Sequence, residues 1–337
     1  MLNRRSVAAI AAAIALGLGA SLLTGADRPA LAADAKPLKI AILLPGATSD
    51  NGYNADGGNA AKALKDTLKA DVQVTENVPI ANQADLYRQY AASGYDLVIG
   101  WGGQFTDGAV QVAEEFPAVK FLVVNSGAAN GKNLASLDTN IADWEFIGGF
   151  VTAKLSKTGV IAWIGGMCFP PTAANLHGVE QGAKYANPDI KIVSTFTGDF
   201  EDPTKAQQTA QAMIDSSKVG AITGNVNNAW FGIFKAADEK KVPLVTEWSD
   251  NSKLAPAVIH SSIQKSQAKF VTEVAKSVAD GKFEAKHQQF GLPADWGPVM
   301  TQTALLPKEI YDAALEVQKK IAAGEIKPVH DTTCPGK

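Results

Sequence analysis

A strand–loop–helix–strand pattern occurs twice in this chain, and it constrains the fold more than any other feature. Residues 96–125 and 219–248 each run from an apolar strand through a loop rich in glycine, asparagine and tryptophan into a helix, a short turn and a second apolar strand. The glycines that close the two first strands, Gly100 and Gly224, are 124 positions apart. The repeat predicts two similar lobes that face each other across a cleft.

Strands and helices alternate along the rest of the chain as well. Apolar runs of strand length, such as Leu38–Leu44, are followed by turn residues and then by segments of helical composition. This order runs through residues 38–125 and again through 144–247. It predicts an α/β fold with parallel sheets that carry helices on both faces. The candidate hinge strands between these blocks are 133–143, 260–267 and 291–303.

The hinge candidates divide the chain into two discontinuous lobes. We expect residues 36–140 and about 266–300 in lobe 1, and residues 141–265 and about 301–327 in lobe 2. The polar C-terminal segment 328–337, which contains prolines and a glycine, is expected to be loose.

The N-terminal segment has the pattern of a cleavable signal peptide. Arg4-Arg5 precedes an apolar run over residues 6–25, and Ala30-Leu31-Ala32 supplies the small-x-small pattern that signal peptidase reads. We expect residues 1–32 to be removed after Sec export, with cleavage after Ala32. Twin-arginine export and a retained membrane anchor are the alternatives. The segment predicts a periplasmic protein, and no cysteine follows the apolar run to accept a lipid.

Charge and arginine content limit the ligands and partners. Residues 33–337 carry 28 Lys and Arg against 33 Asp and Glu, a formal net charge of −5. A mildly acidic chain without basic runs is not expected to bind nucleic acid. Ligands with carboxylates or phosphates usually meet an arginine fork, and Arg88 is the one arginine of this stretch. An uncharged ligand is therefore favoured, although a helix N-terminus could still bind an anion.

Signatures of catalysis and cofactor binding are incomplete or absent. The segment Gly100-Trp101-Gly102-Gly103 lacks the spacing of a dinucleotide fingerprint, and no Walker, HExxH or GxSxG pattern occurs. The four histidines are scattered without the spacing of a metal site. We expect no enzyme activity, no cofactor and no metal.

The chain contains two cysteines, Cys168 and Cys334. They could form a disulfide in an oxidising compartment. Cys168 follows a buried-looking strand and Cys334 lies in the polar tail, and pairing requires Cα atoms within about 7 Å. The sequence leaves both the paired and the free state open.

Residues with ligand-binding chemistry are concentrated in the loops that follow the strands. In parallel sheets, ligands bind beyond the carboxyl ends of the strands. Aromatic faces beside amide and carboxylate groups suit a flat, mostly uncharged ligand with hydrogen-bonding edges. The alternative is that the tryptophans pack the loops while Asn and Asp cap helices and turns. The candidates are Asp50, Tyr53, Asn54, Trp101, Gln104, Phe105, Asp107, Asn225, Asn227, Asn228, Trp230, Trp248 and Asp250.

Six motifs, taken together, are specific to one protein family. They are SDNGYN (49–54), FTDGAVQVAEEFPAVKFLVVN (105–125), IGGFVTAKLSKTGVIAWIGGM (147–167), NPDIKIV (187–193), GDFEDPTKA (198–206) and WSDN (248–251). On these motifs the chain resembles the basic membrane protein family of ABC-transporter substrate-binding proteins, whose known members include purine nucleoside receptors. The resemblance covers nearly all of residues 38–327 and implies the two-lobed, type I periplasmic-binding architecture.

The resemblance assigns roles to four residues of the first lobe. Asp50, Tyr53 and Asn54 match the family's first-loop Asp, aromatic residue and Asn. In family members the aromatic residue packs on the base. Asp107 matches an aspartate that hydrogen-bonds the ligand.

Other positions depart from the family pattern. Trp248 stands where nucleoside-binding members have the first Asp of an Asp-Ser-Asp motif, which holds the ribose hydroxyls. Gln264, beside Lys265, replaces a lysine near the ligand, and Asn175 stands at an aromatic position. Cys168 stands where many relatives have Asp. The changes remove charge and hydroxyl-binding capacity and add an indole face.

Sequence and resemblance together predict an exported receptor of an ABC importer. It is expected to bind a small flat heterocycle (a nucleobase, a nucleoside or a related ring) between its lobes and to close by hinge motion. Tyr53 and Trp248 are expected to stack on the ligand, with Trp101 or Trp230 assisting. The residues expected to read the ligand's edge by hydrogen bonds are Asp50, Asn54, Asp107 and Gln264.

The expected partners are the small-molecule ligand and an ABC permease in the inner membrane, with no nucleic acid, and the receptor is expected to be a monomer. Three alternatives remain. One is a receptor for a neutral sugar, although many sugar receptors of this architecture use arginine in the site. The others are a sensor-type receptor that feeds a membrane signalling protein and an enzyme that acts on a small heterocycle.

Overall fold

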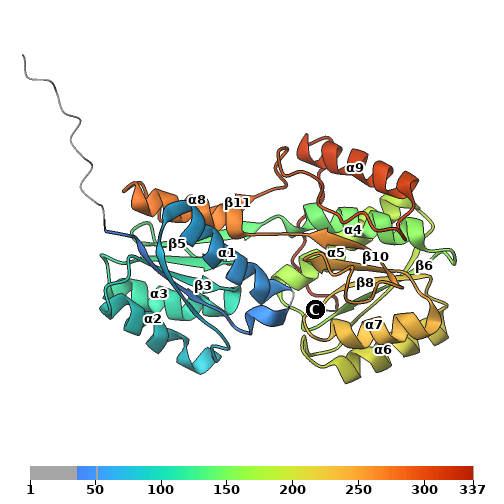
Figure 1. Ribbon diagram of the computed structural model, residues 1–337, viewed down its shortest axis with the longest axis horizontal. Coiled ribbons are helices and arrows are strands. Elements are labelled where there is room, and N and C mark those ends of the chain that lie inside the picture. Colours follow the sequence, from blue (N-terminus) through green and yellow to red (C-terminus); the bar gives the residue numbers. More distant parts are fainter. Residues whose placement is uncertain (1–35, 51, 337) are drawn as a thin grey trace, which may run out of the picture. The chain divides into compact units, whose positions relative to one another are not determined.

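Two parallel β-sheets form the core of the fold in the computed structural model, which describes residues 36–50 and 52–336 (Figure 1). The predicted signal peptide lies outside the described residues. In sheet order, the first sheet contains β11 (His287–Phe290), β5 (Leu134–Thr139), β4 (Lys120–Val124), β3 (Leu97–Trp101), β1 (Lys39–Leu43) and β2 (Asp71–Thr75). The second sheet contains β10 (Ile259–Gln264), β9 (Leu244–Trp248), β8 (Ala221–Asn225), β6 (Val160–Gly165) and β7 (Lys191–Phe196).

Helices cover both faces of each sheet, as the alternation of strand and helix predicts. Ile40 and Ile42 pack in one apolar layer with α1 and α8, whereas Ala41 and Leu43 pack in another with α2 and α3. The second sheet carries α4, α5 and α9 on one face and α6 and α7 on the other (Figure 1). The helices are α1 (Tyr53–Leu68), α2 (Gln83–Ala92), α3 (Thr106–Glu115), α4 (Ile141–Leu155), α5 (Pro170–Ala186), α6 (Pro203–Ser217), α7 (Trp230–Lys240), α8 (Ala268–Ala279) and α9 (Lys308–Ala322).

The repeat in the sequence is a repeat in the structure. Strand β8, helix α7 and strand β9 each begin 124 positions after β3, α3 and β4, respectively. The strand order β4-β3-β1-β2 of the first sheet corresponds to β9-β8-β6-β7 of the second. Trp248, the last residue of β9, therefore occupies the place that Val124 has at the end of β4.

The backbones of helices α4 and α5 are in direct contact at two glycines. A Cβ atom added at Gly149 of α4 would lie 2.1 Å from the carbonyl oxygen of Val179, and one added at Gly182 of α5 would lie 1.8 Å from that of Phe146. Only glycine fits such contacts without moving a helix. Within the described residues, no helix is both long and apolar enough to cross a membrane.

The described chain passes between the two sheets after β5, after β10 and after β11. The segments 133–143 and 260–267, expected to be hinge strands, contain β5 and β10. Segment 291–303 differs from the expected strand, because it pairs through an isolated antiparallel bridge between Met300 and Ile263. The regular strand of this region, β11, lies just before it.

Two buried aspartates anchor these connections. Asp56 of α1 accepts hydrogen bonds from Ser266 Oγ (2.6 Å) and from the backbone N–H of Gln267 (2.8 Å), at the start of α8. Asp143 of α4 accepts one from the backbone N–H of Leu292 (2.9 Å), after β11. Burial raises the pKa of each aspartate to about 6.

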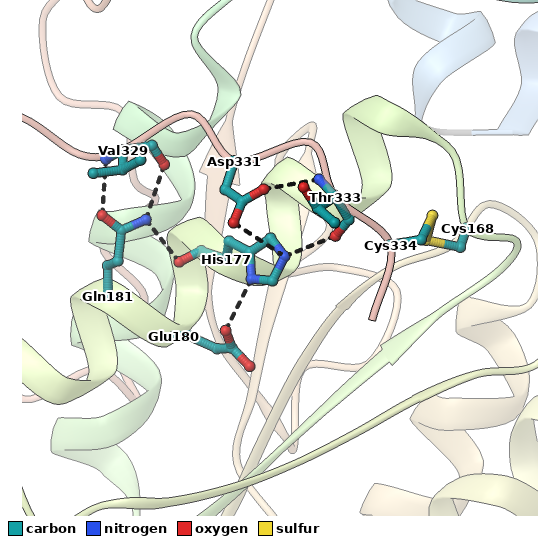
Figure 2. Close-up of polar contacts among 8 residues, drawn as sticks. All are labelled: Cys168, His177, Glu180, Gln181, Val329, Asp331, Thr333 and Cys334. Carbon is teal, nitrogen blue, oxygen red and sulfur yellow. Dashed lines mark hydrogen bonds and ion pairs between the residues drawn. A yellow bond between two sulfur atoms is a disulfide. The ribbon is translucent and has the colours of Figure 1, made fainter. Parts of the chain in front are cut away.

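The C-terminal segment is attached to the second sheet's side of the molecule, which differs from the loose tail that its composition predicts. Cys334 and Cys168 form a disulfide with Cα atoms 6.0 Å apart (Figure 2). A ring nitrogen of His177 lies 2.9 Å from the carbonyl oxygen of Thr333, and Gln181 exchanges two hydrogen bonds with the backbone of Val329. Both helix residues belong to α5, so the tail lies along that helix.

Candidate functional site

Trp248 is the centre of the candidate site, because it lines two pockets at the carboxyl end of the second sheet. The space between atoms is about 290 Å³ at the larger pocket and about 200 Å³ at the smaller, and both volumes include space that is open to solvent. The lining of the larger pocket includes Asp50, Asn227, Trp230, Glu247, Trp248 and Asn251. The lining of the smaller pocket is Thr139, Trp144, Trp248, Lys265, Ser266 and Gln267.

The backbone of Trp248 has an unusual conformation. Its φ is 71°, in the left-handed region that bulky side chains rarely adopt. The surrounding backbone holds it there, since the N–H of Lys265 donates to the Trp248 carbonyl (3.1 Å) and the N–H of Ser249 donates to the Glu247 carbonyl (3.0 Å). Strain of this kind is concentrated at functional sites.

Tyr53 at the start of α1 contacts Trp248 at the end of β9. The two rings meet edge to face, with centroids 5.2 Å apart and planes at 65°. Trp101 lies beneath Tyr53, with its ring centroid 6.2 Å away, and its indole N–H donates to the Tyr53 carbonyl (3.1 Å). Trp101 is fully buried. It therefore supports the stacking residue from the core and does not line either pocket.

The polar groups of the first loop are engaged in holding helix α1. One oxygen of Asp50 accepts from the backbone N–H groups of Gly52 (2.8 Å) and Ala55 (2.9 Å). The other accepts from the backbone N–H (3.0 Å) and side-chain amide (2.7 Å) of Asn54, whose own oxygen accepts from the Gly46 N–H (2.9 Å). Asp50 borders the larger pocket, but its oxygens are occupied by N–H groups at the start of α1. The Asn54 side chain bonds to Asp50 and Gly46, so in this structure both side chains are engaged within the loop.

A buried group of charges lies against Trp248 on the second lobe. The ammonium group of Lys265 pairs with Glu145 (2.5 Å) and with Glu247, and it lies 4.4 Å from the centroid of the Trp248 ring. Burial raises the pKa of Glu145 above its ordinary value, and the nearby Glu247 adds to this. Burial alone lowers the pKa of an ammonium group, but the two carboxylates outweigh it and raise the pKa of Lys265. Lys265 therefore stays charged.

Asn175 belongs to this group of charges and not to a pocket wall. It accepts a hydrogen bond from the Trp163 indole (2.8 Å) and donates one to Glu247 Oε2 (2.8 Å). Since Lys265 donates to the same oxygen, the carboxylate of Glu247 is held in one orientation. Asn175 positions Glu247 from behind.

Each pocket is bordered by one buried donor and one buried acceptor without a hydrogen-bond partner among the described residues. In the larger pocket these atoms are the indole N–H of Trp230 and Oε1 of Glu247. In the smaller pocket they are the indole N–H of Trp144 and Oε1 of Gln267. An unmatched buried polar group costs about 1–3 kcal/mol. The arrangement is therefore suited to a ligand that supplies the missing partners.

Several residues expected in the site lie elsewhere. Gln104, Asp107 and Asp250 are exposed and line neither pocket. Phe105 is fully buried in the core between the first sheet and helices α2 and α3. The Gln264 side chain donates to Thr301 (3.1 Å) and also lines neither pocket.

Of the expected residues, Asp50, Asn227, Trp230 and Trp248 border the larger pocket, and Tyr53 contacts Trp248. The amide of Asn227 donates to Glu201 (2.7 Å) at the rim. The resemblance placed the lysine position of the family at Gln264, but its neighbour Lys265 lines the smaller pocket. The residues that sequence reasoning missed are Thr139, Trp144, Glu145, Glu247, Asn251, Lys265, Ser266 and Gln267.

A usable signal existed for two of these residues. Glu145 and Glu247 lie in largely apolar segments, WEFIGGF and LVTEW, and both are 1% exposed. A charged residue within an apolar run must have a partner when it is buried. Two such glutamates indicate a buried charge cluster, although they do not identify Lys265 as the partner.

Comparison with known proteins identifies the family. The family model described as Bmp, ABC transporter substrate-binding protein PnrA-like, matches residues 38–331. A purine-binding protein of Brucella abortus is 25% identical over 295 residues, 86% of this chain and 83% of the relative. Basic membrane protein D of Borreliella burgdorferi is 27% identical over 304 residues, 87% and 88% of the two chains.

Solved structures show the same fold. An ABC transporter solute-binding protein from Aeropyrum pernix superposes with a TM-score of 0.76 at 22% identity, covering 88% of this chain and 94% of the other. The two parallel sheets flanked by helices confirm the expected type I periplasmic-binding architecture. The chain therefore belongs to the Bmp family of PnrA-like ABC transporter substrate-binding proteins, and it is an extracytoplasmic solute-binding receptor rather than an enzyme.

Proposed function

We propose that this receptor captures a flat heterocycle, such as a free nucleobase, between Tyr53 and Trp248 and delivers it to an ABC permease. The observation that carries the proposal is the set of unpartnered donors and acceptors beside Trp248, because they match a ring with hydrogen-bonding edges. The similarity to a protein named purine-binding supports the same class of ligand.

The pockets favour an uncharged ligand. Arg88 is half-buried on α2 and pairs with Glu115 (2.7 Å) and Asp85 (3.0 Å), and it lines neither pocket. Lys265 is already paired with two carboxylates. The described pocket walls therefore offer no free cation to a carboxylate or phosphate.

Trp248 favours a base over a nucleoside. The resemblance implies that relatives hold ribose hydroxyls with an aspartate at this position, and an indole cannot accept those hydrogen bonds. Its side chain also borders both pockets. We propose that its volume excludes a sugar substituent, so that the ligand is the ring alone.

Isothermal titration calorimetry tests the proposal directly. Adenine, hypoxanthine, uracil, adenosine and a panel of neutral sugars are titrated into the ligand-free protein. Tight binding of a base with weaker binding of its nucleoside supports the proposal, and Trp248→Asp is expected to shift the preference towards the nucleoside. Tight nucleoside binding without base binding contradicts it, and tight sugar binding favours the sugar-receptor alternative.

The cellular role is proposed from the family. We expect a periplasmic monomer that closes around its ligand and then engages an inner-membrane permease. Loss of uptake of the bound solute after gene deletion supports the importer role. Normal uptake with loss of a transcriptional response would instead indicate a sensor-type receptor.

A further inference from the structure

We propose that Glu247 selects the ligand by accepting a hydrogen bond from a ring or amino N–H through Oε1, while the Trp230 indole donates to an adjacent acceptor on the same ligand. The inference rests on the proposed function and names the hydrogen-bonding pattern that the ligand must carry. A cyclic amide or amidine edge, in which an N–H neighbours a lone pair, fits this pair of groups.

The carboxylate of Glu247 is buried and held in one orientation. It is 1% exposed at the end of β9, and it lines the larger pocket. Lys265 and Asn175 both donate to Oε2. Oε1 has no hydrogen-bond partner within the described part of the chain. Two donors therefore fix Oε2 of this carboxylate, and Oε1 remains available to accept a hydrogen bond from a ligand.

Glu247 Oε1 and the Trp230 indole N–H have opposite hydrogen-bonding roles. An ionised carboxylate oxygen only accepts hydrogen bonds, and an indole N–H only donates. A ligand atom with a lone pair would be repelled at Glu247, and an N–H would be left unpaired at Trp230. Because each mismatch leaves buried polar groups unpaired, a ligand of the wrong pattern is expected to bind tenfold or more weakly.

The charge that directly contacts Glu247 is the ammonium group of Lys265. The same ammonium group pairs with Glu145 of α4, and burial disfavours a negative charge on Glu145. A cation therefore lies directly beside the carboxylate that borders the larger pocket.

Glu247→Gln tests this selection sharply. The donors Lys265 and Asn175 require an oxygen at the position of Oε2, so the amide oxygen of the new side chain takes that place. Its NH₂ group then faces the pocket, where an acceptor had been. The substitution converts an acceptor–donor pair into two donors without changing the shape of the side chain.

9-Methyladenine and 1,9-dimethylhypoxanthine are the probes. 9-Methyladenine presents an amino donor beside the N7 acceptor, whereas 1,9-dimethylhypoxanthine has no N–H and an oxygen at that position, as guanine does, and so presents two adjacent acceptors. We expect Glu247→Gln to shift the ratio of the two affinities towards 1,9-dimethylhypoxanthine by tenfold or more, measured by calorimetry. The control is Glu239→Gln, the same change at an exposed position of α7, which is expected to leave the ratio unchanged.

Each outcome has a defined meaning. An unchanged ratio in Glu247→Gln, with binding retained or uniformly weakened, overturns the inference but leaves the proposed function intact. If neither the bases nor related rings bind the native protein, the proposed function fails and the inference fails with it.

A second measurement does not depend on the folding of the variant. The ligand that co-purifies with the native protein is extracted and identified by mass spectrometry. A heterocycle with an N–H next to an acceptor supports the inference. A heterocycle without any N–H overturns the inference alone, and a sugar overturns both proposals.

Discussion

The ammonium group of Lys265 lies 4.4 Å from the centroid of the Trp248 ring, and it pairs with the carboxylate of the preceding residue, Glu247. One cation therefore holds both the ring and the carboxylate that border the pocket. Lys265 also donates its backbone N–H to the Trp248 carbonyl. The left-handed backbone at Trp248 is maintained by these contacts and not by local preference.

This strain predicts a difference between two substitutions that both remove the indole. Trp248→Gly is expected to be more stable than Trp248→Ala by about 1 kcal/mol, because glycine adopts a positive φ without steric cost. Urea unfolding of both variants gives the difference in the free energy of unfolding. Equal stability, or a more stable alanine variant, would show that the backbone at this position is relaxed.

The contact between α4 and α5 predicts that Gly182→Ala is strongly destabilising. The added methyl would lie 1.8 Å from the Phe146 carbonyl oxygen, so one helix must move. Overpacking of this kind costs about 1–3 kcal/mol or more, which thermal unfolding detects. Gly127→Ala is the control, because its added Cβ meets no atom within 4 Å. A similar melting temperature for the two variants would contradict the close packing.

The disulfide between Cys168 and Cys334 predicts a redox-dependent stability. Its reduction is expected to lower the free energy of unfolding by about 2–4 kcal/mol, because the bridge closes a long loop in the unfolded chain. Thermal unfolding with and without a reducing agent measures the effect. The double variant Cys168→Ser/Cys334→Ser should match the reduced protein and ignore the reductant. Sensitivity of that variant to reductant would point to another cause.

Asp56 predicts a stability that falls as the pH rises from about 4 to 6. Burial raises its folded pKa to about 6, above the unfolded value of about 3.9, so the folded state binds the proton more tightly. Its contribution is complete below the unfolded pKa and is lost as the pH passes the folded pKa. Asp56→Asn removes this contribution, so urea unfolding at pH 4, 5 and 6.5 should show a flatter profile. Asp143 and Glu145, whose pKa values are shifted in the same direction, contribute to the remaining slope. An unaltered profile would contradict the shift at Asp56.

Much of the fold could be predicted because its signals are local. Strand and helix periodicity, and a repeat with one constant offset, are written in contiguous residues. Strand β11 was not predicted, because its sequence, HQQF, is polar. The strand lies at the edge of the first sheet, where half-exposed residues do not require an apolar run. The sequence left the pairing of Cys168 and Cys334 open, because their approach depends on how the tail lies along α5.

The site was predicted less completely, for two physical reasons. Asp50 and Asn54 have the chemistry of ligand-binding residues, but short-range hydrogen bonds to the start of α1 occupy them. In the group of Glu145, Glu247 and Lys265, Glu145 lies 120 positions from Lys265, whereas Glu247 lies 18 positions from it. The spacing of these residues in the sequence does not indicate that they are partners, because they meet only once the second sheet has formed.

The conformation of Trp248 also bears on how this receptor can evolve. Tryptophan has the single codon UGG, and replacing its first base with G gives the glycine codon GGG. One nucleotide change would therefore relax the backbone and remove the ring that borders both pockets. A change in the shape of the candidate site lies within one mutational step.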